Sequence, residues 1–302
     1  MVEQGADQKL PMIDSALVRR LIDSQFPQWA GLPLTLLDPA GSDHVIHRLG
    51  DELAVRLPRH PGPMLAARKE AVWLPKLARQ LPLPIPVHEA IGDPGFGYPW
   101  PWSVTRWLPG DVATDVPELG DSVSTAQDLG HFLAVLEEFP SEGLPGDVIT
   151  AGLITEDPRA ARDRRTRAAI DQVENSFPAK ALIELWDAAL AARQSDLRPV
   201  WIHGDFHAGN LLATNGRISA VIDFSGMGIG DPACDFAVAF GFMSPRVRRL
   251  FRRILGVDDA TWMRARGMAV AGGLIAYTSY GADNRRLAER TTRQVMDALV
   301  GE

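Results

Sequence analysis

Val200-Trp-Ile-His-Gly-Asp-Phe-His-Ala-Gly-Asn-Leu-Leu212, continued by Ile222-Asp-Phe-Ser225, is the stretch around which the whole chain can be interpreted. It sets polar side chains between short apolar runs that are typical of buried strands. Polar groups among core-forming strands cost free energy unless a site uses them. The stretch therefore indicates a functional site, with candidate residues His203, Asp205, His207, Asn210 and Asp223.

The dipeptide Asn215-Gly216 inside this stretch predicts a tight hairpin turn, because both residues readily adopt positive φ. With a two-residue turn and a regular ladder, Asn210 would lie opposite Val221. Asp223, two residues further on, would then share the face of Asn210. Asp205, on the loop that leads into the hairpin, can reach the same face.

Asp205, Asn210 and Asp223 offer oxygen atoms only. Hard oxygen ligands, without a thiolate or a close histidine pair, suit Mg²⁺ and a phosphate substrate far better than zinc. The sequence therefore predicts magnesium-assisted phosphate chemistry at this site.

The order and spacing of these residues resemble a known catalytic core. His203-Gly204-Asp205, then Asn210, then Ile222-Asp223-Phe224 is similar to the motifs of the aminoglycoside phosphotransferase family, a branch of the protein-kinase-like fold. A single Asp or Asn on a loop indicates only a cap or a turn, whereas three elements in this order rarely arise by chance. The resemblance implies an α+β, two-lobed fold. A small antiparallel-sheet lobe that binds nucleotide would span 1–106, and a larger, mainly helical lobe for catalysis and acceptor binding would span 107–302.

Composition excludes several other functions. The net charge of −7 over 302 residues, without a long basic tract, argues against a nucleic-acid partner. The single cysteine, Cys234, excludes an internal disulfide and suits a reducing compartment. The N-terminal residues do not have the pattern of a signal peptide, and the longest apolar run, near 268–277, is too short to span a membrane. We expect a cytoplasmic protein without a membrane partner; its oligomeric state is open.

The N-terminal part reads as a helix within 12–30, strands over 33–37, 44–49 and 52–57, and a second helix from 63 to about 81. The loop between the first two strands contains Ser42 and a single glycine, Gly41. The resemblance implies that this loop, and Ser42 within it, covers the nucleotide phosphates. Without the resemblance it would be an ordinary turn.

Glu70 falls on the apolar stripe of the second helix, where a carboxylate needs a cation. Arg56, on the strand before that helix, is the candidate partner. The resemblance implies that this pair corresponds to the kinase strand-lysine and helix-glutamate pair, with arginine in place of lysine, and that Arg56 holds the α- and β-phosphates. The alternative is a surface glutamate on an imperfect helix.

The apolar strand that begins at Trp102 stops at Pro109-Gly110. The resemblance implies that it leads into the interlobe hinge, where Thr105, Arg106 and Leu108 contact the adenine edge through backbone groups. Trp107 either lines the nucleotide pocket or packs in the core.

After the hinge the pattern is mainly helical. Asp231 is expected to cap a helix, and Asp235 to anchor the catalytic loop by hydrogen bonds. His203 is interpreted as a structural histidine, whereas His207 either approaches the acceptor or packs.

Together these residues predict a small-molecule kinase. It would move the γ-phosphoryl group of ATP or GTP to a hydroxyl group, with Asp205 orienting the hydroxyl and Asn210 and Asp223 holding Mg²⁺. The expected acceptor is an aminoglycoside-type antibiotic, which would make the protein a resistance enzyme. Alternatives are a macrolide, choline-like, sugar or amino-acid-like acceptor, a nucleotide-binding pseudokinase, or a metal-dependent phosphohydrolase.

Overall fold

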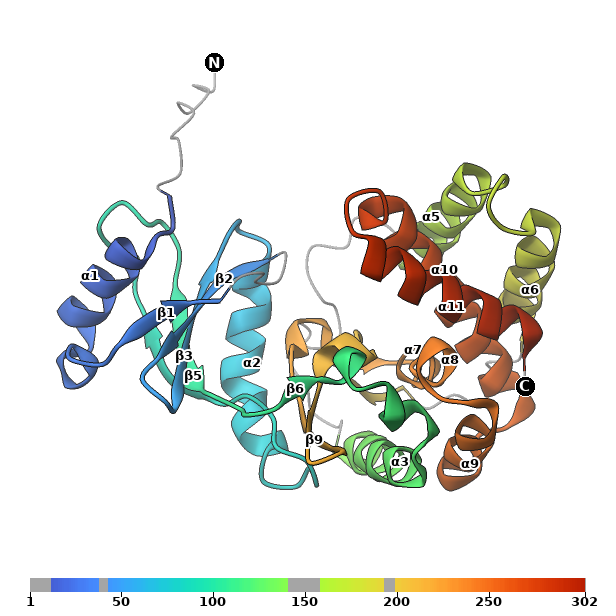
Figure 1. Ribbon diagram of the computed structural model, residues 1–302, viewed down its shortest axis with the longest axis horizontal. Coiled ribbons are helices and arrows are strands. Elements are labelled where there is room, and N and C mark those ends of the chain that lie inside the picture. The colour runs from blue at the N-terminus through green and yellow to red at the C-terminus, as the bar shows by residue number, and fades with distance from the viewer. Residues whose placement is uncertain (1–11, 38–42, 141–157, 193–198, 302) are drawn as a thin grey trace, which may run out of the picture. The chain divides into compact units, whose positions relative to one another are not determined.

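The computed structural model describes residues 12–37, 43–140, 158–192 and 199–301, which form two compact units (Figure 1). Unit 1 comprises 1–76 and 86–108, and unit 2 comprises 77–85 and 109–302. The short segment 77–85, which follows the second helix in sequence, thus belongs to unit 2.

Unit 1 contains a five-stranded antiparallel sheet in the order β1-β2-β3-β5-β4. Alternation along β3 turns Val55 and Leu57 to one face and Arg56 to the other. The chain turns between β2 and β3 at Gly50, whose φ of 61° favours glycine. The strands are β1 (Leu34–Leu36), β2 (His44–Leu49), β3 (Leu53–Pro58), β4 (His88–Gly92) and β5 (Trp102–Arg106).

Two helices flank this sheet, and Figure 1 shows them on opposite sides. Helix α1 (Ser15–Gln25) begins where Asp14 Oδ1 accepts a hydrogen bond of 2.8 Å from Leu17 N. Its buried face packs with side chains of β2, β3 and β5, including Val55 and Leu57. Helix α2 (Pro63–Leu77) ends two residues after Pro75 and before residue 81, where its end was predicted; Pro75 removes one hydrogen bond from its last turn.

Unit 2 contains two small β elements. β6 (Asp111–Val112), β8 (Leu211–Thr214) and β9 (Arg217–Val221) form a three-stranded sheet, and β7 (Val200–Ile202) pairs with β10 (Gly228–Gly230). Asn215 and Gly216 have φ values of 54° and 72°, which confirms the predicted turn between β8 and β9.

The remainder of unit 2 is mainly helical. Around α10, glycines let helices approach closely: a methyl group on Gly267 would lie 2.3 Å from Ala189 Cβ, and one on Gly273 would lie 2.8 Å from Val295 Cγ2. The helices are α3 (Val123–Glu138), α5 (Pro158–Gln172), α6 (Ala179–Ala191), α7 (Ala233–Phe236), α8 (Ala239–Phe242), α9 (Pro245–Leu255), α10 (Asp259–Tyr280) and α11 (Arg285–Val300). Within the described ranges, no helix has the length and apolar character needed to cross a membrane.

Candidate active site

The β8–β9 hairpin differs from the regular ladder that the sequence predicted. A bulge places Leu212 opposite Ala220 and Leu211 opposite Val221. The expected pairing of Asn210 with Val221 is therefore wrong by one residue, and Asn210 O instead accepts a hydrogen bond of 2.9 Å from Ile222 N. Asp223 adopts a left-handed conformation with φ of 63°, so strand alternation does not determine where its side chain points.

Residues 203–210 form a loop between β7 and β8 that buried Asp235 holds in place. Asp235 Oδ2 accepts a hydrogen bond of 2.6 Å from His203 N, and Oδ1 accepts one of 2.9 Å from Gly204 N. Burial raises the pKa of Asp235, and these backbone hydrogen bonds oppose the rise. The predicted anchoring role of Asp235 is confirmed.

His203 is fully buried and belongs to the scaffold of the same loop. Its Nδ1 accepts a hydrogen bond of 3.3 Å from Asp205 N, so its Nε2 carries the proton and donates to Ile222 O at 3.0 Å. Both ring nitrogens are therefore occupied by backbone groups. This arrangement confirms the interpretation of His203 as a structural histidine.

A close backbone contact links the loop to the turn that follows Asp223. Gly204 has φ of 83°, and a methyl group on it would lie 2.2 Å from Gly226 O. Only glycine fits this position without moving the backbone. Asp223 Oδ1 accepts a long hydrogen bond of 3.4 Å from Ser225 N in the same turn.

Asp205 and Asn210 are held together inside the loop. Asn210 Nδ2 donates to Asp205 O at 2.9 Å and to Asp205 Oδ2 at 3.1 Å. Both amide hydrogens of Asn210 are used here, and its carbonyl oxygen is an acceptor only. Asn210 is buried, whereas the side chain of Asp205 is 55% exposed and accessible to a substrate.

His207 lies beside Asp205, and the structure resolves where this side chain goes. Its Nδ1 accepts a hydrogen bond of 3.0 Å from Gly209 N, and its Nε2 lies 3.5 Å from Asp205 Oδ2. Burial by itself would raise the pKa of Asp205, but His207, His203 and the hydrogen bond from Asn210 lower it to about 2. Asp205 is therefore a carboxylate at neutral pH.

The donor atoms fit a magnesium ion that is bound together with phosphate. In the part of the chain that the structure describes, no three His, Cys, Asp or Glu side chains converge as a metal site. Mg²⁺ in nucleotide sites needs only one or two protein oxygens, because phosphates and water complete its shell. The Asn210 amide oxygen and the Asp223 carboxylate, at the two ends of the hairpin, are hard oxygens of this kind.

The second part of the predicted site lies in unit 1, where Arg56 and Glu70 form a buried ion pair. Arg56 Nη1 lies 3.3 Å from Glu70 Oε2, with the two side chains 13% and 4% exposed. This contact confirms the pair and excludes the alternative of a surface glutamate. Burial alone would raise the pKa of Glu70, but Arg56, followed by His88 and His44, lowers it.

Sequence reasoning missed the contribution of His88 to this pair. His88 Nε2 lies 3.4 Å from Glu70 Oε2, a contact without the alignment of a good hydrogen bond. His88 starts β4, which pairs with β5 and not with the strand of Arg56. No local pattern in the sequence connects these three side chains.

The segment expected to contact adenine comprises the end of β5 and the residues that follow it in unit 1. Thr105 is buried and pairs in the sheet, and the exposed side chain of Arg106 forms an ion pair of 3.1 Å with Glu89. The N–H of Arg106 bonds Val87 O, and that of Trp107 bonds Glu52 O. Of these backbone donors, only the Leu108 N–H is left without an acceptor among the described residues.

Three further predictions have different outcomes. Ser42 lies outside the described residues. The Trp107 ring packs under the guanidinium of Arg48, whose Cζ lies 5.0 Å from the ring centroid. Asp231 caps the next helix through Ala233 N at 3.1 Å, and it also pairs with Arg264 of α10, which the sequence did not indicate.

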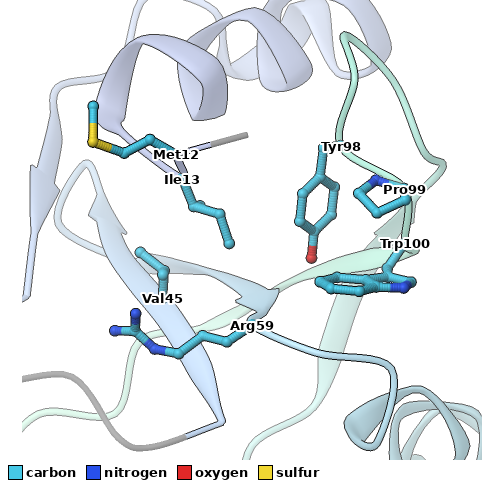
Figure 2. Close-up of a pocket in the computed structure, with 7 residues that line it drawn as sticks. All are labelled: Met12, Ile13, Val45, Arg59, Tyr98, Pro99 and Trp100. Atoms are coloured by element: carbon cyan, nitrogen blue, oxygen red, sulfur yellow. The ribbon is translucent and has the colours of Figure 1, made fainter. Parts of the chain in front are cut away.

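A pocket of about 320 Å³ in unit 1 lies away from these groups (Figure 2). Val45 in its wall pairs with Leu57 on the α1 side of the sheet, opposite to the face of Arg56. Two polar atoms of its lining bond to the backbone, since Tyr98 Oη donates to Pro58 O and Arg59 Nε donates to His44 O. Figure 2 shows Tyr98 and Trp100 across the pocket from Met12 and Ile13.

Comparisons with known structures agree with this fold. The wild-type aminoglycoside 2'-phosphotransferase-IIIa in its GDP complex aligns with a TM-score of 0.70 at 19% identity, covering 96% of this chain and 100% of that one. The macrolide 2'-phosphotransferase MphH from Brachybacterium faecium aligns at 0.62 and 22%, covering 92% and 97%. The streptomycin–ATP ternary complex of APH(2")-IIa aligns at 0.59 and 16%, covering 90% and 92%.

The search against curated proteins found no match. The family model described as the phosphotransferase enzyme family matches residues 37–287. This match spans both the Arg56–Glu70 pair and the 203–210 loop. The chain therefore belongs to the phosphotransferase enzyme family, whose members transfer phosphoryl groups, and it has the protein-kinase-like fold of the aminoglycoside phosphotransferases.

Proposed function

We propose that the protein transfers the γ-phosphoryl group of ATP or GTP to a hydroxyl group of a small molecule. This proposal is carried by the hydrogen bonds from Asn210 to Asp205, on a loop that Asp235 fixes through its backbone N–H groups. Phosphoryl transfer depends mainly on positioning and electrostatics, and this loop supplies both. The names of similar structures add support, since they include GDP and ATP complexes.

Asp205 is the group that receives the acceptor. Its carboxylate would accept a hydrogen bond from the acceptor hydroxyl and take the proton as the oxygen bonds to the γ-phosphorus. The bond between this phosphorus and the bridging oxygen breaks, and its electron pair leaves with the nucleoside diphosphate. His207, 3.5 Å from Asp205 Oδ2, would hold the carboxylate in orientation.

The remaining residues bind the nucleotide. Asn210 and Asp223 would hold Mg²⁺, which supplies charge neutralisation at the phosphates when bound. Arg56, fixed by Glu70, would contact the α- and β-phosphates through its planar guanidinium. Thr105, Arg106 and Leu108 are the proposed hinge residues, with the N–H of Leu108 as the donor to the base. Ser42 is proposed for the loop over the phosphates.

The first acceptor class to test is an aminoglycoside-type antibiotic, because two of the similar structures carry aminoglycoside phosphotransferase names. Macrolides are the second class, and one feature of the structure favours them. Helix α11 places the half-buried cation of Arg290 against the 203–210 loop, and a polycation would be repelled by this charge. A macrolide phosphotransferase is also among the similar structures.

The test measures nucleoside diphosphate release with Mg·ATP and Mg·GTP across aminoglycosides, macrolides and choline-like, sugar and amino-acid-like alcohols. We expect acceptor-dependent release with at least one class. The variant Asp205→Ala should lose turnover by about 10³-fold or more while nucleotide binding is retained. Unchanged turnover in this variant would contradict the proposed mechanism. Nucleotide binding without any transfer would indicate a pseudokinase, and no nucleotide binding at all would indicate a phosphohydrolase.

A further inference from the structure

Arg290 is a cation whose position the proposed chemistry does not explain. It lies on α11, 80 residues after the end of the 203–210 loop in sequence, yet its guanidinium lies against Gly209 of that loop. A methyl group on Gly209 would come within 3.0 Å of Arg290 Nη1, and equally close to His207 Nδ1. Gly209 thus lies against both the His207 ring and the Arg290 guanidinium.

Neighbouring arginines of α11 are used differently. Arg285 pairs with Glu289 at 2.8 Å, and Arg286 lies 4.0 Å from Asp115, both with side chains 92% exposed. Arg290 is half-buried, and among the described residues it has no carboxylate within ion-pair distance. Burial lowers the pKa of its guanidinium, and the charge of Asp205 opposes that change.

A half-buried guanidinium without an ion pair is costly, and an anion that binds beside it relieves that cost. The catalytic loop determines which anion arrives there. An acceptor oxygen that is hydrogen-bonded to Asp205 lies about 3 Å from the carboxylate. The γ-phosphorus of the nucleotide lies about another 3 Å beyond that oxygen. The Arg290 guanidinium lies against Gly209, four residues after Asp205 in the same loop, which brings this cation to the side of the loop where the acceptor oxygen would bind.

We propose that Arg290 is a catalytic residue that contacts the phosphoryl group while it is being transferred. This inference rests on the proposed function. During the transfer, negative charge is spread over the equatorial oxygens of the phosphoryl group, between the leaving diphosphate oxygen and the incoming hydroxyl oxygen. Arg290 would donate N–H groups to these oxygens, while Asp205 takes the proton of the hydroxyl. Its contribution would be larger in the transition state than in the bound nucleotide.

The experiment uses the full chain with Mg·ATP and no added acceptor, so that water takes the place of the hydroxyl. Three variants are compared: Arg290→Gln, Arg290→Lys, and Arg293→Gln as an exposed control on the same helix. The first readout is the rate of ATP hydrolysis, and the second is the affinity for Mg·ADP. The third is the rise in melting temperature when aluminium fluoride, a mimic of the transferring phosphoryl group, is added to Mg·ADP.

We expect Arg290→Gln to lower hydrolysis by about 10²- to 10³-fold, to leave the dissociation constant for Mg·ADP within about twofold, and to abolish the response to aluminium fluoride. Arg290→Lys should retain part of the hydrolysis rate and part of the rise in melting temperature with aluminium fluoride. It replaces the glutamine variant as the test if that variant folds poorly. Arg293→Gln should match the unmodified protein.

Two results would overturn the inference. If the Arg290 variants lose Mg·ADP affinity in parallel with turnover, the residue supports the loop and not the transferred group. If hydrolysis and the fluoride response are unchanged, then any loss seen with an acceptor would show that Arg290 binds an anionic group of that acceptor. Failure of the unmodified protein to bind Mg·ATP would instead contradict the proposed function itself.

Discussion

Glu137 near the end of α3 is predicted to make the protein less stable at alkaline pH. Its Oε1 atom is buried without a hydrogen-bond partner among the described residues. Burial, together with the nearby charges of Asp235 and Glu138, raises its pKa from the ordinary 4.5 to about 7. The folded protein therefore holds a proton on Glu137 that the unfolded chain releases at lower pH.

The sign of the effect follows from this difference in proton binding. Between pH 4.5 and about 7 the folded state binds more protons than the unfolded state, so stability falls as the pH rises. The favourable contribution is complete below pH 4.5 and is lost above pH 7. A shift of this size corresponds to about 3 kcal/mol, since each pKa unit is worth about 1.4 kcal/mol.

The variant Glu137→Gln has the shape of the protonated side chain at every pH. We expect it to raise the free energy of unfolding by about 2–3 kcal/mol at pH 8 and to change it little at pH 5. Urea unfolding at the two pH values measures this, with the exposed neighbour variant Glu138→Gln as control, expected to change stability by less than about 0.5 kcal/mol. A Glu137→Gln protein that is no more stable than the unmodified protein at pH 8 would refute the reasoning.

Two further changes test the scaffold. Gly204→Ala should lower the free energy of unfolding by more than about 3 kcal/mol and abolish most of the turnover, because its methyl group would meet Gly226 O at 2.2 Å. The control Gly216→Ala has a similar φ but open space around it, and it should lower the free energy of unfolding by only about 1 kcal/mol. Thermal unfolding measures both. Glu70→Ala should lower the free energy of unfolding by about 3 kcal/mol, because it leaves buried Arg56 without its ion-pair partner. The double variant Arg56→Met with Glu70→Leu should recover much of this stability but not nucleotide affinity. Equal losses for the single and double variants would contradict the second expectation.

Local pattern explains which parts of the site could be predicted. Glu70 interrupts an apolar stripe, so the sequence pattern predicts a cationic partner for its carboxylate. The dipeptide Asn215-Gly216 is a strong local signal for the hairpin turn. The bulge between β8 and β9 has no such signature, and it moved Asn210 by one residue. Asp223 leaves the strand in a left-handed conformation that the sequence does not mark.

Long-range partners were missed for a different reason. His88 and Arg290 reach Glu70 and the catalytic loop from elements far away in the sequence. An arginine on a helix that carries several arginines has the same local pattern whether it faces solvent or a site. Only the packing of α11 against the rest of unit 2 separates Arg290 from Arg285 and Arg286.

The same packing bears on the acceptor. The groups that fix the loop of Asp205 by hydrogen bonds all lie between 203 and 235, so one short stretch of the sequence encodes them. The surface that an acceptor would meet is built from separate helices, and α11 brings the guanidinium of Arg290 against the loop that holds Asp205. A polycationic acceptor must overcome this charge, whereas a neutral or anionic alcohol need not. If aminoglycosides prove to be substrates, we therefore expect their binding to strengthen in Arg286→Glu, and a salt titration of the Michaelis constant would measure the electrostatic part.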